Sequence, residues 1–213
     1  MATWIKICGI TRPEDARAAF DAGADAIGIN FWSGSRRYCR PEAAREIMSV
    51  LREGELAYGV FVRAPREEVA RIVRDVGIGG VQFHGEESND DVAGWNVPTI
   101  RAIAATGRQA VAAALAIRHS LLATQGGGYR LLVDHGSGGG SGRPVDETML
   151  DRLDLAAAIL AGGLTPRNVA DRVARFRPFG VDTAGGVESA PGIKDAAAIE
   201  DFIRNARKQG RSI

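Results

Sequence analysis

Short apolar runs alternate with longer amphipathic runs along the whole chain. The short runs are rich in Ile, Val, Leu, Ala and Phe and are bounded by Gly, Pro or charged residues. Runs of this kind predict strands that are buried on both faces of a sheet. The predicted strands cover residues 4–8, 26–31, 57–62, 80–83, 99–103, 130–134, 157–161 and 180–182.

The longer runs place apolar residues at helical spacing. Pro13 and Pro65 stand at the start of two of these runs, where proline is favoured. The alanine-rich segment 108–123 has the highest helix propensity of the set. The predicted helices cover residues 13–22, 41–51, 66–76, 90–93, 108–123, 148–153, 167–176 and 193–208.

The alternation of strand and helix predicts a parallel sheet, because each parallel neighbour requires a crossover connection. Eight strand–helix units are the number that closes a (β/α)8 TIM barrel. No linker or shift in composition divides the chain, so residues 1–213 are expected to form a single (β/α)8 barrel domain of the α/β class. A doubly wound open sheet is the alternative, although it normally has fewer strands in this length.

Composition narrows the classes of partner. The chain has 213 residues, of which 45% are hydrophobic and 25% charged, and its net charge is +1, so we expect no binding to nucleic acid or to membranes. No signal peptide is evident, and the longest apolar run, 110–117, is too short to span a bilayer. Cys8 and Cys39 are too few for a disulfide framework, and a cytoplasmic location is predicted.

Polar residues at the ends of the predicted strands are the candidates for chemistry, since barrel enzymes react at that face. Each has an ordinary alternative. Cys8 would serve equally as a small buried apolar residue, Asp134 as a helix cap or a partner for a nearby arginine, and a lone histidine such as His84 more often bonds to backbone. The strand-end candidates are Cys8, Asn30, His84, Arg101, Asp134 and Asp182.

Two glycine pairs follow the last two predicted strands. Gly162-Gly163 follows the seventh strand and Gly185-Gly186 follows the eighth. In barrels these two loops often bind phosphate, because glycines let backbone N–H groups approach the oxygens. No nucleotide-binding P-loop and no cluster of metal ligands is evident, so the sequence predicts a phosphorylated small molecule as ligand and requires no metal.

Several stretches taken together resemble the phosphoribosylanthranilate isomerase family of tryptophan biosynthesis. They occur in the order of that family and span nearly the whole chain. The matching stretches are KICGI at 6–10, SRRY at 35–38, VQFHGE at 81–86, VD at 133–134 with GGSG at 139–142, LAGGL at 160–164, and GVE at 186–188 with PGIKD at 191–195.

The resemblance implies a (β/α)8 barrel without a cofactor that performs an Amadori rearrangement of an aminoaldose to an aminoketose. It implies that Cys8 is the general base, that Asp134 is the general acid, and that Arg37 pairs with the anthranilate carboxylate, rather than being a solvated loop charge. Cys8 would then need a lowered thiol pKa, which a helix N-terminus could supply. Asp134 would have to be protonated at the start of the cycle.

The remaining expected contacts combine the strand-end and glycine-loop positions with this resemblance. His84 and Asp182 are expected to bind substrate, and residues 136–142 are expected to form a lid. The phosphate is expected on backbone amides of the two glycine loops. The expected phosphate-binding residues are Gly162, Gly163, Ala184 and Gly185.

Four positions depart from the family pattern. Arg36 stands where the family usually has proline, Ala184 and Gly185 stand where it has two serines, and Glu147 stands where it has an aromatic residue. The loss of a serine hydroxyl would remove a phosphate contact worth about 0.5–1.5 kcal/mol.

Two other functions stay open at this point. One is the histidine-pathway isomerase, which performs the same rearrangement on a larger bis-phosphorylated substrate, and the other is a non-catalytic barrel that binds a phosphorylated ligand. A monomer is expected, with a homodimer as the alternative.

Overall fold

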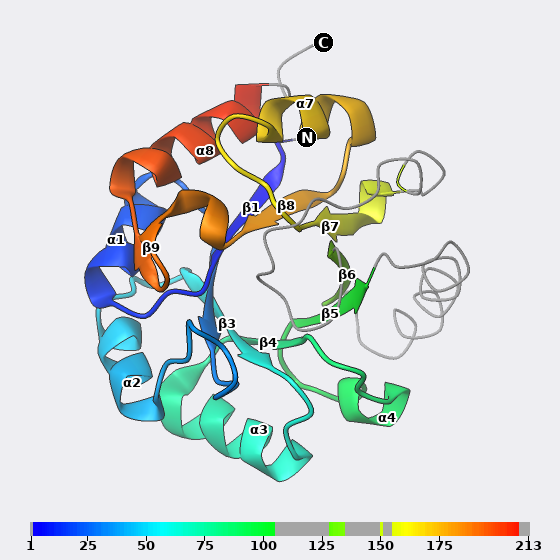
Figure 1. Cartoon of the computed structure of the whole chain (residues 1–213). Helices are drawn as coiled ribbons and strands as arrows, with labels where there is room; N and C mark the ends of the chain where they lie inside the picture. The colour runs from blue at the N-terminus through cyan, green and yellow to red at the C-terminus, as the bar shows by residue number, and fades with distance from the viewer. Residues whose placement is uncertain (1, 105–127, 135–149, 151–154, 209–213) are drawn as a thin grey trace.

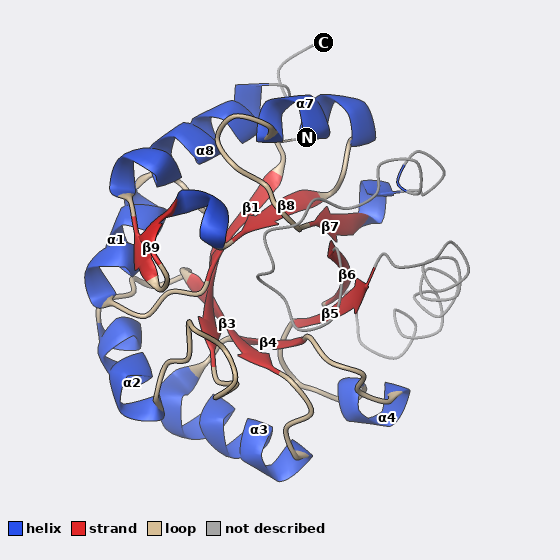
Figure 2. Ribbon diagram, in the orientation of Figure 1, coloured by secondary structure: helices blue, strands red, loops and turns tan. Residues whose placement is uncertain are grey.

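The computed structural model shows a closed barrel of eight parallel strands (Figure 1). It describes residues 2–104, 128–134, 150 and 155–208. Each strand pairs with the next in chain order, and β1 pairs with β8 to close the ring. Helices surround the strands (Figure 2). The predicted (β/α)8 barrel is confirmed. The strands are β1 (Trp4–Cys8), β2 (Ala26–Asn30), β3 (Leu56–Phe61), β4 (Gly80–Phe83), β5 (Thr99–Ala104), β6 (Tyr129–Asp134), β7 (Ala158–Leu160) and β8 (Gly180–Thr183).

The helices agree with the predicted segments in number and order wherever the structure describes them, and they differ at their ends. Predicted helix 108–123 and nearly all of 148–153 lie outside the described residues, as does the predicted lid 136–142. The described helices are α1 (Pro13–Asp21), α2 (Pro41–Ser49), α3 (Arg66–Ile72), α4 (Asn89–Val92), α7 (Val169–Phe176) and α8 (Ala196–Lys208), with short helical turns η1 (Val73–Gly77), η2 (Leu155–Ala157) and η3 (Gly185–Val187).

Three predicted helices need correction. The prediction that a helix begins at 193 is wrong, because residues 193 and 194 form β10 (Ile193–Lys194), which pairs antiparallel with β9 (Glu188–Ala190) before α8 begins. The predicted helix 66–76 changes after Ile72 into the wider π-turn η1. Helix α7 begins at Val169 rather than at 167, because Asn168 first bonds back to the preceding loop.

The side chains of each strand alternate between two apolar regions. Odd-numbered residues of β1, such as Ile5 and Ile7, pack in the larger core between the strands and the helices. A second cluster, which includes Tyr58, Ile100 and Leu132, fills the barrel interior at its N-terminal end. Because side chains alternate along a strand, Lys6 and Cys8 share the interior side of β1 with Trp4, which packs against this second cluster. This alternation places polar side chains above the interior apolar layer.

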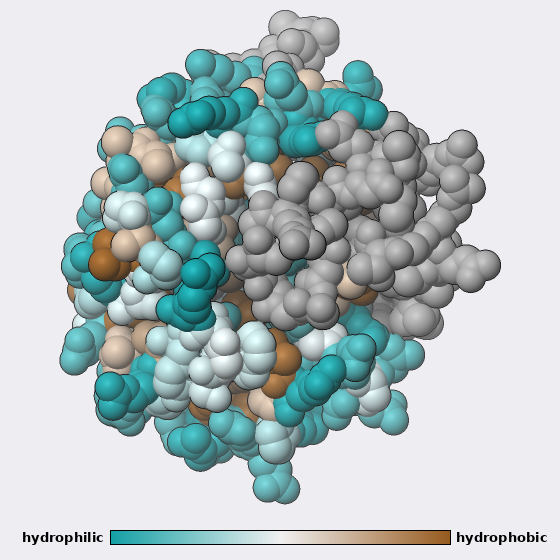
Figure 3. Space-filling view, viewed as in Figure 1, coloured by the Kyte–Doolittle hydropathy of each residue, from teal (hydrophilic) through white to brown (hydrophobic). Residues whose placement is uncertain are grey.

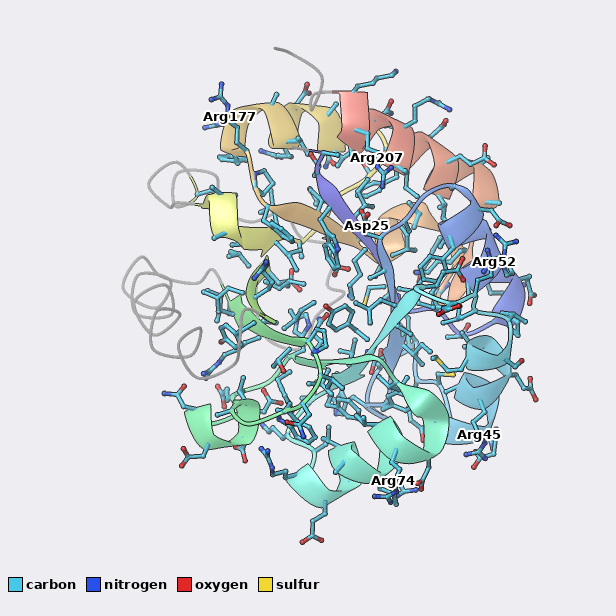
Figure 4. All side chains as sticks on the ribbon, turned by 180° about the vertical axis from the view of Figure 1, so that it is seen from behind. Asp25, Arg45, Arg52, Arg74, Arg177 and Arg207 are labelled. Atoms are coloured by element: carbon cyan, nitrogen blue, oxygen red, sulfur yellow. The ribbon has the colours of Figure 1, made fainter. Side chains whose placement is uncertain are left out.

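Charged side chains cover the outside of the barrel. Hydrophilic residues occupy much of the periphery that is drawn in colour in Figure 3. From behind, Arg207 of α8 lies beside Asp25, at an Nη2–Oδ2 distance of 3.3 Å, and Arg45, Arg52 and Arg74 lie on the outer rim (Figure 4). No helix in the described part of the chain has the length and apolar character needed to cross a membrane.

Candidate active site

A cavity of about 460 Å³ opens at the C-terminal ends of the strands. All nine residues predicted to act in catalysis or binding line this cavity. Pockets of this size commonly take small-molecule ligands. The structure therefore brings together residues that are far apart in the sequence, at the end of the barrel where catalysis is expected. The nine residues are Cys8, Arg37, His84, Asp134, Gly162, Gly163, Asp182, Ala184 and Gly185.

Of the other two strand-end candidates, one lines the cavity and one does not. Asn30 lines the cavity, and its Oδ1 accepts a hydrogen bond from the backbone N–H of Trp32. Arg101 does not line it. Its guanidinium instead donates to the backbone oxygen of Glu87 at 2.8 Å and to Asn89, which braces the loop after β4.

Cys8 ends β1, and this partly buried residue lines the cavity. It pairs in register with Gly28 of β2. A Cβ atom at Gly28 would lie 2.8 Å from Cys8 Sγ and 2.9 Å from Lys6 Nζ, so both side chains occupy the space over this glycine. Gly28 is therefore required for the close packing of the thiol and the ammonium group.

Lys6 is fully buried inside the barrel. Its Nζ donates to Asp182 Oδ1 of β8 at 2.9 Å, and the two residues are paired in register. Burial lowers the pKa of Lys6, but the Asp182 carboxylate and a Cys8 thiolate outweigh burial, so the net pKa is raised and Lys6 stays protonated. Sequence reasoning gave Lys6 no role, although its i, i+2 spacing from Cys8 places both on one side of β1.

The pKa of the Cys8 thiol is raised, so the expected lowering is wrong. Burial, which penalises the thiolate, is the largest cause. The positive charges of Lys6 and Lys194 oppose it, whereas the carboxylate of Asp182 adds to it. The groups that favour the thiolate are therefore cationic side chains, Lys6 and Lys194 among them, rather than a helix N-terminus.

Asp134 ends β6 and contacts His84, which follows β4. His84 Nε2 lies 3.2 Å from Asp134 Oδ2, and its Nδ1 lies 2.9 Å from Nε2 of the buried Gln82. When the Gln82 amide donates to Nδ1, the proton of the neutral ring lies on Nε2 and points to Asp134. The ordinary alternative for His84, bonding to backbone, is wrong, because both ring nitrogens face side chains.

Arg37 follows β2 and is only 8% exposed, which rules out a solvated loop charge. Its Nε and Nη2 donate to the two carboxylate oxygens of Glu188, at 2.6 and 2.8 Å. Glu188 Oε1 also accepts from Lys194 Nζ at 2.9 Å. Burial raises the pKa of Glu188, but the bonds from Arg37 and Lys194 outweigh it and the net pKa is lowered. Sequence reasoning assigned no role to Glu188 or Lys194, because the pairing is visible only in three dimensions.

The two glycine loops after β7 and β8 lie against each other. Thr183 Oγ1 donates to the backbone oxygen of Leu164 at 2.7 Å, and a Cβ atom at Gly186 would lie 1.8 Å from that same oxygen. Gly162 and Gly163 have φ angles of 87° and 67°, in the left-handed region that favours glycine. These contacts bring the backbones of both loops to one wall of the cavity.

Within the described ranges, no group of three or more His, Cys, Asp or Glu side chains is placed to hold a metal ion.

Comparison with known proteins gives one consistent family. Residues 5–205 match the family described as N-(5'phosphoribosyl)anthranilate (PRA) isomerase. The chain is 42% identical over 205 residues to the N-(5'-phosphoribosyl)anthranilate isomerase of Pseudomonas fluorescens Pf0-1, covering 95% of this chain and 97% of the relative. It is 38% identical to that of Myxococcus xanthus, covering 97% of each chain.

Several solved structures of the same family are similar to this chain. The phosphoribosyl anthranilate isomerase of Thermotoga maritima superposes with a TM-score of 0.83 at 34% identity, covering 96% of this chain and 98% of that one. A complex of such an isomerase with reduced 1-(o-carboxyphenylamino)-1-deoxyribulose 5-phosphate gives a TM-score of 0.78 at 33% identity, with the same coverage. Another similar structure is of monomers generated from the dimeric Thermotoga maritima enzyme.

Proposed function

The chain belongs to the N-(5'-phosphoribosyl)anthranilate isomerase family of tryptophan biosynthesis, and from this premise we propose that Cys8 and Asp134 perform the two proton transfers of its reaction. The reaction converts N-(5-phosphoribosyl)anthranilate to 1-(2-carboxyphenylamino)-1-deoxyribulose 5-phosphate. The observation that supports the assignment is that one cavity receives Cys8 from β1 and Asp134 from β6, on separate arcs of the barrel. A substrate between them can exchange protons with both.

The chemistry fits these two residue types. Asp134 protonates the ring oxygen of the aminosugar, which opens the furanose to an iminium ion. The Cys8 thiolate then removes the proton from C2, and the adjacent iminium accepts the electron pair to give an enolamine, which ketonises to the product. Positioned proton transfer of this kind contributes on the order of 100- to 10,000-fold per group.

His84 supports Asp134 in this scheme. The 3.2 Å contact of the ring with Asp134 Oδ2 orients the carboxyl group, and Gln82 holds the ring in place from its other nitrogen. This extends the proposed role of His84 from substrate binding to holding the acid.

Arg37 is proposed to bind the anthranilate carboxylate. Glu188 occupies its Nε/Nη2 edge, so the substrate carboxylate would meet the Nη1/Nη2 edge. Two parallel N–H···O bonds on that edge suit a planar carboxylate. The bidentate bond to Glu188 fixes the plane of the guanidinium before substrate arrives.

Backbone amides of the loops that contain Gly162, Gly163, Ala184 and Gly185 are proposed to bind the substrate phosphate. Lys194 Nζ donates to the backbone oxygen of Ala184 at 3.0 Å, which fixes the second loop and adds positive charge behind it. That buried cation offsets the missing hydroxyls at Ala184 and Gly185. Asp182 stays a proposed substrate contact, since it lines the cavity.

The test is fluorescence-monitored consumption of freshly generated phosphoribosylanthranilate by the wild type, Cys8→Ala and Asp134→Asn. We expect turnover by the wild type and a loss of at least 100-fold in each variant with an unchanged circular dichroism spectrum. Most of the activity surviving in either variant would refute that residue's role. A folded wild type without turnover would favour the non-catalytic barrel. Family membership favours this reaction over the histidine-pathway isomerase, and the monomeric state and cytoplasmic location stay predictions.

A further inference from the structure

Lys6 is a fully buried lysine beside the proposed base. Its ammonium group lies in the barrel interior, 2.9 Å from the Asp182 carboxylate. A buried charge is costly unless it is paired, and a residue kept there at such a cost is often functional. An ion pair of this kind can also have a purely structural role. The position of Lys6 relative to Cys8 distinguishes a functional role from a structural one.

The geometry places the ammonium group against the thiol. Lys6 and Cys8 are two residues apart on β1 and both face the interior. A Cβ atom at Gly28 would lie within 3.0 Å of both Lys6 Nζ and Cys8 Sγ, so both side-chain ends lie against the backbone of this residue. Any larger residue at position 28 would occupy the space that Lys6 and Cys8 fill. The same packing holds Lys6 Nζ between a carboxylate on β8 and the thiol on β1.

We propose that Lys6 is a positioning residue whose fixed positive charge stabilises the thiolate of Cys8, and that Asp182 holds Lys6 in place for this task. The inference rests on the proposed function, in which Cys8 acts as the base. It assigns Lys6 an electrostatic role through Cys8 and no proton transfer of its own.

Four charged groups act on a Cys8 thiolate. Lys6 of β1, Lys194 of β10 and Arg37 after β2 are cationic, and Asp182 of β8 is anionic. Asp182 therefore has two opposite effects: it keeps Lys6 protonated and positioned, and it repels the thiolate. Removing only the carboxylate charge should free Lys6 to pair with Cys8, whereas removing both charges should leave the thiolate without its nearest cation.

The experiment compares the wild type with Asp182→Asn and with the double variant Lys6→Met/Asp182→Asn. The double variant avoids leaving a buried carboxylate unpaired, which would destabilise the fold. The rate of alkylation of Cys8 by iodoacetamide is measured from pH 6 to 10, and mass spectrometry of the Cys8 peptide separates it from Cys39. Circular dichroism and thermal melting check the fold of each variant.

We expect the midpoint of the Cys8 titration to fall in Asp182→Asn relative to the wild type. In the double variant it should lie about one to two pH units above that of Asp182→Asn, so that alkylation below both midpoints slows by about 10- to 100-fold. If the pair serves only the fold, its loss lowers the melting temperature, and the midpoint of the double variant stays at that of Asp182→Asn. Equal midpoints in the two variants would overturn the proposal. If the double variant does not fold, the absence of a downward shift in Asp182→Asn overturns it instead.

The pH profile of kcat separates this inference from the proposed function. If the alkylation midpoint and the rising limb of kcat move together between variants, both ideas are supported. If the alkylation midpoint moves and kcat does not follow it, Lys6 still stabilises the thiolate, but Cys8 is not the base.

Discussion

Replacing Gly28 with alanine would place a methyl group in the narrow space shared by Cys8 and Lys6. The new Cβ atom would lie 2.8 Å from Cys8 Sγ, 2.9 Å from Lys6 Nζ and 3.1 Å from Lys6 Cε. Ordinary carbon–carbon contacts are about 3.5–4.0 Å. Gly28 lies in a regular strand outside the left-handed region, so alanine adds no backbone strain there and the effect comes from crowding alone.

The crowding has two measurable consequences. Overpacking of a close-packed interior costs about 1–3 kcal/mol, and in a chain of this size each kcal/mol lowers the melting temperature by about 2–4 °C. Lys6 is held by Asp182 and is fully buried, so Cys8 is the side chain that has room to move, toward the cavity. A shift of the sulfur by about 1 Å would cost on the order of 100-fold in rate.

The assay measures kcat, KM and melting temperature for Gly28→Ala, with Gly79→Ala as the matched control. A Cβ atom at Gly79 would lie 2.8 Å from Leu56 Cδ1, the end of a flexible side chain at the N-terminal end of β3, remote from the cavity. We expect kcat to fall by 10- to 100-fold in Gly28→Ala with little change in KM, and to stay near wild type in the control. A Gly28→Ala enzyme with wild-type kcat and melting temperature would refute the packing argument.

Three further substitutions test the side of the cavity that is proposed to bind the carboxylate and the phosphate of the substrate. Arg37→Lys keeps the positive charge but loses the bidentate hydrogen bond to Glu188. In steady-state assays kcat/KM should therefore fall by about 10- to 100-fold, mainly through a higher KM. An unchanged KM would contradict substrate binding by Arg37. Because the folded-state pKa of Glu188 is lowered, its ionised form stabilises the fold above the unfolded pKa of about 4.3, and this contribution is lost as pH falls through the folded value. Glu188→Gln should therefore lower the melting temperature at pH 7 and flatten its decline between pH 5 and 3, and parallel melting curves would contradict the pairing. Thr183→Val removes the hydrogen bond from Thr183 Oγ1 to the Leu164 backbone oxygen. Urea denaturation should then show a free energy of unfolding lower by about 1–3 kcal/mol, and calorimetry should show weaker binding of inorganic phosphate. Wild-type values of both would show that the loops are held by other contacts.

The barrel could be predicted from the sequence because parallel strands that are buried on both faces consist of consecutive apolar residues. Leu131 to Val133, for example, faces the helices and the interior in turn, and every residue is buried. The end of the chain was predicted less well. Ile193 and Lys194 fit a helical pattern, but they pair with β9 because Lys194 is held by Glu188 and by Asp15, whose Oδ2 accepts from the Lys194 backbone N–H at 3.1 Å.

The ends of the strands could also be predicted to gather the candidate residues, because that follows from parallel strands in a closed ring. The partners of those residues could not be predicted. Lys6 and Asp182 are 176 positions apart, and Arg37 and Glu188 are 151 apart. Their pairing depends on the register with which β8 closes against β1 and on the hairpin after η3, neither of which leaves a local pattern in the sequence.

The charges around Cys8 give a reason for the thiolate to form in a buried site. Lys6, Lys194 and Arg37 supply three positive charges, whereas Asp182 and Glu188 supply two negative ones within the part of the chain that the structure describes. A Cys8 thiolate brings this buried group to neutrality, which offsets the desolvation that raises its pKa. An anionic ligand at Arg37 or at the glycine loops would compete for the same positive charge. Saturating inorganic phosphate should therefore move the alkylation midpoint of Cys8 to higher pH, and a midpoint that does not respond to phosphate would show that the two charges are not coupled.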